Sequence, residues 1–179
     1  DDSANTWSET SIAASMTDQV ATIAFPHFDA AVDIANSQNI LVAWSGVDTL
    51  NSDLRCWTVT DSAITEVTNV VLNSTDDQGL TAIGIDTTTG HWYVFYGGKS
   101  DGSEVYLTNI NIYYKKSTDS GTTWGSETLL TTRLRDITWL ICTPRFVNHF
   151  GVAFHSDVSL DEIHYSAKLP TTGGSIMIN

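Results

Sequence analysis

The sequence predicts an all-β protein, on the basis of its composition, its local patterning and an internal repeat. Thr, Ser, Val and Ile are abundant, and Trp, Tyr and Phe occur six times each among 179 residues. β-Branched and aromatic side chains suit the pleated, half-buried surface of a sheet. Short apolar runs are separated by Gly, Asn, Asp, Ser and Thr, and no stretch shows sustained helical periodicity.

The repeat consists of two motifs that alternate along the chain. An aspartate-led segment occupies residues 2–7, 61–66 and 119–124, and its aspartates stand 59 and 58 residues apart. An apolar run lies between these segments, at residues 39–46, 91–98 and 149–156. Two interleaved motifs in a constant order indicate repeated structural units rather than chance similarity.

Each unit divides into four short strands. The expected strands are 30–35, 39–46, 53–60 and 64–72 in the first unit, 80–86, 91–98, 105–117 and 123–131 in the second, and 137–143, 148–155, 160–166 and 173–178 in the third. Four antiparallel strands within about 50–60 residues describe a β-propeller blade. A β-sandwich is the alternative, but it does not account for a turn repeated at constant spacing.

The third aspartate segment carries a family resemblance. Residues 117–124 read Ser-Thr-Asp-Ser-Gly-Thr-Thr-Trp, which fits the Ser-x-Asp-x-Gly-x-Thr-Trp Asp box. The chain therefore resembles the sialidase-type Asp-box (BNR) repeat β-propeller family. The resemblance implies that the box joins the third and fourth strands of a blade, away from the ligand. The residues to which it gives a structural role are Asp2, Thr6, Trp7, Asp61, Thr65, Ser117, Asp119, Gly121, Thr123 and Trp124.

The chemistry of this box is local. An aspartate side chain can accept hydrogen bonds from backbone N–H groups just ahead of it, and glycine supplies a positive φ. The tryptophan can wedge between neighbouring sheets. Ala4 and Ala63 replace the glycine in the other two boxes, and Glu66 replaces the tryptophan. We therefore expect the second box to be an ordinary turn.

Three blades are too few for a ring, because propellers close with about four to eight. We expect blades at residues 21–72, 73–131 and 132–179, preceded within residues 1–20 by the outer strand of another blade. The chain is then either part of a longer propeller or a subunit whose ring a homo-oligomer completes. Oligomerisation would also cover exposed sheet edges.

The charge excludes some partners. The chain has 21 acidic and 8 basic residues, a formal net charge of −13 and a pI near 4.4. Such a field repels the phosphates of nucleic acids and anionic membranes. No segment is apolar enough to insert into a membrane. Cys56 and Cys142 show no metal-binding spacing.

In a propeller, one face is built from the loops between strands two and three and from those between successive blades. These loops hold the polar ligand-binding candidates, which are His27, Asp29, Asp48, Asp77, Asp101, Glu104, Arg133, Arg135, Asp136, His155 and Asp157. We expect no cofactor. The one ion considered is Ca²⁺, for which carboxylates near Asp76 and Asp101 supply oxygen ligands without forming a recognised calcium loop.

The resemblance also implies what a sialidase would need: three arginines for the substrate carboxylate, a tyrosine nucleophile with a nearby glutamate, and an acid/base aspartate. Only Arg133 and Arg135 fall in the expected ligand loops, on one segment, and no tyrosine lies there. The catalytic set is incomplete, so no residue is assigned to catalysis.

These observations favour a non-catalytic module that binds glycan or another protein, or that serves in surface or virion assembly. Two alternatives stay open: a fragment of a sialidase or another exo-glycosidase, and a purely structural coat or fibre component. The low Lys and Arg content beside abundant Ser, Thr and Asp points to an extracellular or surface-displayed setting, including a viral particle.

Overall fold

The computed structural model describes residues 27–34, 39–48, 51–60, 63–66, 70, 79–101, 103–104, 110–131, 137–147, 150–158, 160–168 and 175–178. All regular elements in these segments are β-strands, so the expected all-β class is confirmed. Within them, no helix of the length and apolarity that a bilayer crossing requires is found.

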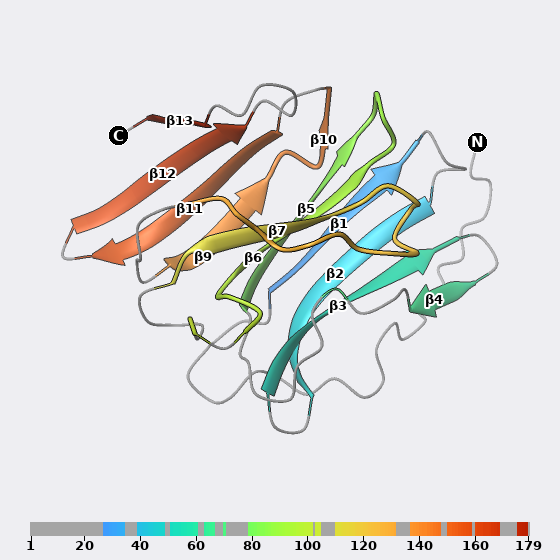
Figure 1. The fold of residues 1–179 in the computed structure, drawn as a ribbon, viewed down its shortest axis with the longest axis horizontal. Helices are drawn as coiled ribbons and strands as arrows, with labels where there is room; N and C mark the ends of the chain where they lie inside the picture. Colours follow the sequence, from blue (N-terminus) through green and yellow to red (C-terminus); the bar gives the residue numbers. More distant parts are fainter. Residues whose placement is uncertain are drawn as a thin grey trace, which may run out of the picture.

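The strands form three sheets (Figure 1). The first sheet contains β1 (His27–Asp33), β2 (Asn39–Asp48), β3 (Asn51–Val59) and β4 (Ile64–Glu66) in chain order. The middle sheet contains β5 (Gly79–Asp86), β6 (Trp92–Gly97), β7 (Ile112–Ser117) and β8 (Thr128–Leu129), with β10 (Arg145–Phe146) beside β5. The third sheet contains β9 (Ile137–Cys142), β11 (Phe150–Val158), β12 (Leu160–Lys168) and β13 (Ser175–Ile178).

The strands lie close to their expected positions, with three differences. β7 begins at Ile112 rather than at 105, and residues 105–109 lie outside the described part. β8 is shorter than expected because the box turn occupies the residues before it, whereas β4 covers Ile64–Glu66 and most of the remainder of its expected range lies outside the described residues. β10 was not expected, and it pairs parallel with β5, whereas the four chain-order strands of each sheet pair antiparallel. The blade boundaries themselves stay a prediction.

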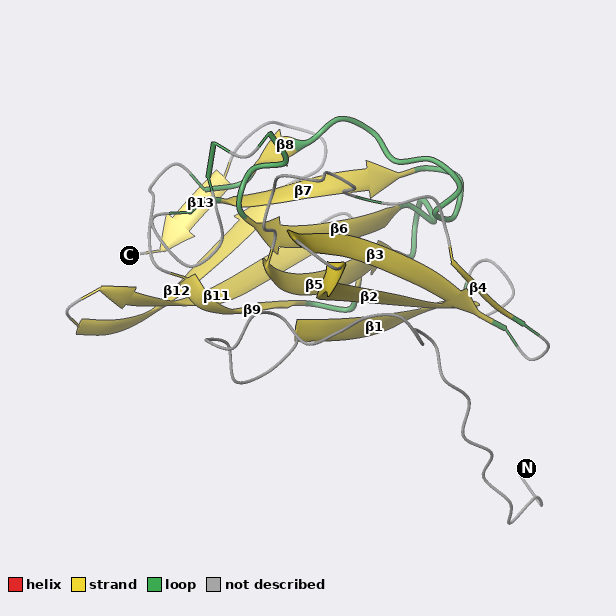
Figure 2. Ribbon diagram, turned by 90° about the horizontal axis from the view of Figure 1, so that it is seen from below, coloured by secondary structure: helices red, strands yellow, loops and turns green. Residues whose placement is uncertain are grey.

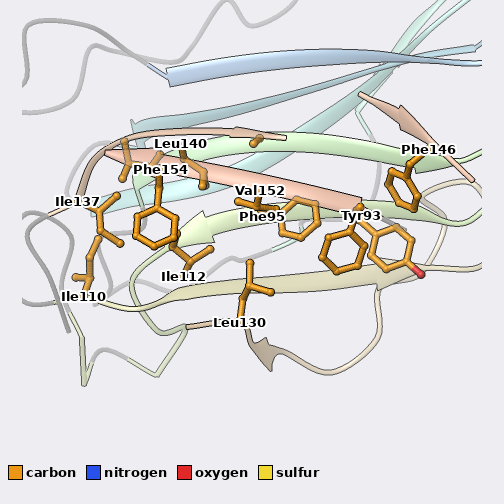
Figure 3. Packing of buried hydrophobic residues seen from close by; sticks show 13 residues of the cluster. Tyr93, Phe95, Ile110, Ile112, Leu130, Ile137, Leu140, Phe146, Val152 and Phe154 are labelled. Atoms are coloured by element: carbon orange, nitrogen blue, oxygen red, sulfur yellow. The ribbon is translucent and has the colours of Figure 1, made fainter. Parts of the chain in front are cut away.

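The middle sheet is packed on both faces because its apolar residues fill both sides of the pleat. On β6, Trp92, Val94 and Tyr96 pack toward the first sheet, whereas Tyr93 and Phe95 pack toward the third. The first interface consists of Ala31, Leu54, Cys56, Val70, Ile83, Ile85, Trp92, Val94, Tyr96 and Tyr113. The second interface consists of Leu80, Ala82, Tyr93, Phe95, Ile110, Ile112, Leu130, Ile137, Leu140, Phe146, Phe150, Val152 and Phe154 (Figure 3).

The first strands of the three sheets lie side by side. β1 and β9 both neighbour β5, and Figure 2 shows β1 and β9 along the lower side with β7 and β8 above. Backbone N–H groups on and just after the outer edge of β5 find acceptors in β1 and in the segment that follows β9. Ile83 N donates to Asp29 Oδ2 at 2.9 Å, and Ile85 N and Thr87 N donate to the carbonyls of Pro144 and Phe146. The edge is therefore closed.

Candidate functional site

The polar groups of the middle sheet gather around the β6–β7 connection. Glu104, in this connection, accepts three hydrogen bonds from the start of β7. Asn111 N donates to Oε2 at 2.8 Å, Asn111 Nδ2 to Oε1 at 3.0 Å, and the Tyr113 hydroxyl to Oε1 at 2.8 Å. The Glu104 carboxylate is thus held in one orientation while its side chain stays partly exposed.

A second carboxylate lies just before β8. Glu127 Oε2 accepts the Tyr96 hydroxyl at 2.7 Å and the backbone N–H of Ser100 at 2.9 Å. The rings of Tyr96 and Tyr113 stack with centroids 6.4 Å apart, so the two tyrosine–glutamate pairs are neighbours. Glu127 is partly exposed, and within the described residues its Oε1 accepts no hydrogen bond. We call Tyr96, Tyr113, Glu104 and Glu127 the Tyr–Glu cluster.

Both phenols of the cluster are neutral donors. Burial is the main cause that raises the pKa of Tyr96 and of Tyr113 far above the usual range, and the hydrogen bonds to Glu127 and Glu104 raise them further. Tyr96 is completely buried. A tyrosine nucleophile needs a lowered pKa or a base that can take its proton while substrate is in reach. The buried Tyr96 is instead a structural group.

Lys115 lies beside the cluster and bonds to the segment that joins the first and middle sheets. Its ammonium donates to the carbonyl of Val70 at 2.7 Å. Burial lowers the pKa of Lys115, against the raising effect of the Glu127 charge. On the same strand, Tyr113 is buried and Tyr114 packs on the second interface.

Asp101 is tied into its own loop. Lys99 Nζ donates to Oδ2, and Ser103 N and Oγ donate to Oδ1 at 3.0 and 2.6 Å. The bond from Lys99, followed by those from Ser103, holds the pKa of Asp101 far below its usual range. Among the described residues, no group of three or more His, Cys, Asp or Glu could hold a metal. Asp76 lies outside them, so the calcium site stays a prediction.

The other candidate ligand residues do not join this cluster. Asp29 bridges two sheets through the N–H groups of Ala30 and Ile83, and burial raises its pKa despite these bonds. His155 is partly exposed on β11, opposite Trp139 of β9. His27 lies in β1, Asp48 in β2 and Asp157 in β11. Asp77, Arg133, Arg135 and Asp136 lie outside the described residues.

The third Asp box forms the turn between β7 and β8, at the end of β7 opposite Glu104. Asp119 Oδ1 accepts Thr123 N and Ser117 Oγ, both at 2.8 Å, and Oδ2 accepts Thr123 Oγ1 at 2.6 Å. Gly121 has a φ of 85° and donates its N–H to Ser117 Oγ at 2.8 Å. Trp124 packs against the first interface, between the first and middle sheets.

The described residues on either side of positions 61–62 of the second box bond to each other between β3 and β4. Thr60 N donates to the Ala63 carbonyl at 2.9 Å, and Ala63 N donates to Thr60 Oγ1 at 3.1 Å. Glu66, in place of the tryptophan, receives a two-point ion pair from Arg55. Thr65 is an exposed residue of β4, and Asp61, Asp2, Thr6 and Trp7 lie outside the described residues.

Sequence reasoning missed most of the Tyr–Glu cluster. Tyr96 shares a repeat position with Trp44 and Phe154, which indicated packing and not a polar contact. Glu127 carries no motif, and its partner is 31 residues away along the chain. The two cysteines, Cys56 and Cys142, are free and belong to different interfaces.

No protein-family model matches the sequence, and no curated protein matches it. Solved structures do. A Hadza microbial sialidase matches with a TM-score of 0.56 at 14% identity, over 86% of this chain and 36% of its own. An α-L-arabinofuranosidase from Clostridium thermocellum matches with a TM-score of 0.52 at 12% identity, over 85% of this chain and 50% of its own.

A third similar structure is an N-acetylgalactosamine deacetylase from F. plautii in complex with blood group B trisaccharide. Its TM-score is 0.56 at 10% identity, over 80% of this chain and 49% of its own. The chain thus spans half or less of the length of these three structures. The chain shares its all-β fold with part of these glycan-active proteins.

Proposed function

We propose that this chain provides three blades of a β-propeller and acts as a non-catalytic module that binds glycan through the Tyr–Glu cluster. The observation that carries the proposal is the Glu127 carboxylate. Tyr96 and Ser100 orient it through Oε2, while Oε1 has no donor among the described residues and can accept a hydrogen bond from a ligand. Sugar hydroxyls are donors of the kind that such a carboxylate accepts, and bonds to a charged acceptor are the stronger ones.

The neighbouring groups suit binding better than hydrolysis. Glu104 lies beside Glu127 and is oriented by Asn111 and Tyr113, which gives the cluster a second fixed acceptor. The phenol next to each carboxylate is neutral and hydrogen-bonded. The similarity to a sialidase, an arabinofuranosidase and a deacetylase supports a glycan as the ligand class. An extracellular or surface location belongs to the same proposal.

Glycan binding is tested on an array of sialylated and neutral glycans, followed by titration calorimetry with the best-bound sugar. Glu127→Gln keeps the shape of the side chain and an oxygen that Tyr96 can donate to, but removes the charge. We expect this substitution to weaken binding by roughly tenfold or more. Glu66→Gln is the matched control, because it neutralises a carboxylate in the first sheet, and it should leave affinity unchanged.

Two results would contradict this function. One is an array on which no glycan binds the folded chain. The other is turnover of a fluorogenic sialoside or arabinofuranoside by the purified chain, which would favour the alternative of an exo-glycosidase fragment. That alternative is motivated by the sialidase and arabinofuranosidase among the similar structures.

A further inference from the structure

The register of the first two strands makes the three sheets comparable residue by residue. Phe28 pairs with Trp44, Thr81 with Tyr96, and Leu140 with Phe154. The three partners occupy the same position of the repeated apolar run. Phe28, Thr81 and Leu140 are therefore equivalent. Every second residue of a strand lies on the same face of its sheet, so each of the three belongs to a row of alternate residues that we compare between the sheets.

This first row faces the preceding sheet. In the middle sheet it continues with Ile83 and Ile85, which pack in the first interface. In the third sheet Leu140 packs in the second interface, and Cys142 packs against it. The equivalent row of the first sheet is Phe28, Ala30 and Val32, for which the described residues contain no preceding sheet.

The alternate row faces the following sheet. Leu80 and Ala82 of β5 pack in the second interface, and Ala31 of β1 packs in the first. The equivalent residues of β9 are Trp139 and Ile141, because Ile141 pairs with Ala153 as Ala82 pairs with Phe95. The described residues contain no sheet that follows the third one.

Both end rows are exposed and apolar, unlike their buried equivalents. Phe28 is 70% exposed, Trp139 57% and Ile141 45%. The acidic residues of β1, Asp29 and Asp33, lie on the other row, where they bond to Ile83 N and Trp92 Nε1. The outward row of β1 is thus uncharged, and on the same face of the first sheet the charge of Arg55 on β3 is balanced by its ion pair with Glu66 on β4. Figure 1 shows the two end sheets on opposite sides of the middle sheet.

We propose that these two end faces bind a second copy of this chain, head to tail. The Phe28 row of one copy packs on the Trp139 row of its partner, so each contact continues the interfaces already present between the three sheets. A twofold pair makes two such contacts and closes a ring of six sheets, within the range of about four to eight that propellers use. The chain spans 36–50% of the length of the solved structures that it resembles, so a second copy, with three more sheets, would bring the pair to about their size.

The area is sufficient for a stable pair. A four-stranded face with strands about 4.8 Å apart and a rise of about 3.3 Å per residue covers roughly 400 Å² over six residues. A pair makes two contacts, and each contact covers one face of both copies. The total area buried is then roughly 1,600 Å², which is the size of a standard specific interface. This inference is independent of glycan binding, since the Tyr–Glu cluster does not contribute to either end row.

The test is the mass of the 179-residue chain by sedimentation velocity and light scattering over a concentration series. We expect two copies for the unmodified chain. Phe28→Glu and Trp139→Glu each place a charge in both contacts and should each weaken association at least tenfold. Leu129→Glu is the matched control, because Leu129 is also 45% exposed but lies on β8 of the middle sheet, and this variant should still pair.

Other outcomes overturn the proposal. An unmodified chain that stays monomeric up to its solubility limit means that the end rows are covered by other parts of the chain or by another protein. If only one of the two substitutions dissociates the pair, like faces meet and the contact is not head to tail. Growing oligomers mean that the contact does not close at two copies. Circular dichroism establishes that each variant is folded, and glycan titration of the Phe28→Glu monomer separates this proposal from the proposed function.

Discussion

At the scale of single residues, the side chain of Asp119 organises the best-preserved turn. Its two oxygens accept hydrogen bonds from Thr123 N, Thr123 Oγ1 and Ser117 Oγ. The carboxylate thus supplies the hydrogen bonds that hold the turn together. The bonds from Thr123, followed by that from Ser117, lower the pKa of Asp119 below its ordinary value of 3.8. The ionised form is therefore the one that stabilises the turn.

This shift makes the contribution of Asp119 depend on pH. A lowered folded-state pKa gives stability that is present above the unfolded pKa and is lost as the pH falls through the folded pKa. Asp119→Ala should lower the melting temperature at neutral pH by roughly 2–4 °C. Near pH 2 this difference between variant and parent should shrink, as measured by thermal denaturation. Thr118→Ala, at an exposed neighbour, serves as control; an unchanged difference at both pH values would refute the mechanism.

At the scale of elements, β5 depends on close contact with the third sheet and the segment that follows β9. Gly84 lies where a side chain does not fit: a Cβ there would stand 2.7 Å from Phe146 Cε1 and 3.1 Å from the Thr143 carbonyl oxygen. The hydrogen bonds from Ile85 N and Thr87 N to the same segment keep this backbone near. The glycine thus permits the edge of β5 to be covered by the end of β9 and the segment that follows it.

Gly84→Ala should consequently destabilise the fold. Overpacking of this kind costs about 1–3 kcal/mol, and here one of the close atoms is backbone, which cannot rotate away. Denaturant unfolding measures the loss. Gly125→Ala is the control, because its Cβ would meet only the Lys116 carbonyl oxygen, at 3.3 Å, and should cost less. Equal losses for the two variants would show that the Phe146 contact is not the cause.

At the scale of the whole molecule, charge opposes compactness. The 21 acidic residues outnumber the 8 basic ones, and their mutual repulsion is relieved in the unfolded chain. Added salt screens this repulsion, since the Debye length falls from about 10 Å at 0.1 M to about 3 Å at 1 M. The melting temperature should therefore rise between these NaCl concentrations. A fall would mean that specific ion pairs such as Arg55–Glu66 outweigh the net repulsion.

The sequence by itself determined the strands and the turns between them, because both depend on neighbours within a few residues. Short apolar runs between turn residues marked β5, β6 and β9, and the repeated aspartate marked the turn after β7. The same local pattern could not reveal β10, whose pairing with β5 joins residues far apart in the chain.

Only the tertiary structure decided the roles of the polar residues. Asp29 looked like a loop ligand, yet its partner Ile83 is 54 residues away, and the donor to Asp33 is Trp92, at a separation of 59. The hydrogen bond between Tyr96 and Glu127 likewise joins residues 31 positions apart. Strand periodicity is a property of the local backbone, whereas a carboxylate's partner depends on which sheets stack against each other, and that is settled only when their apolar faces pack together.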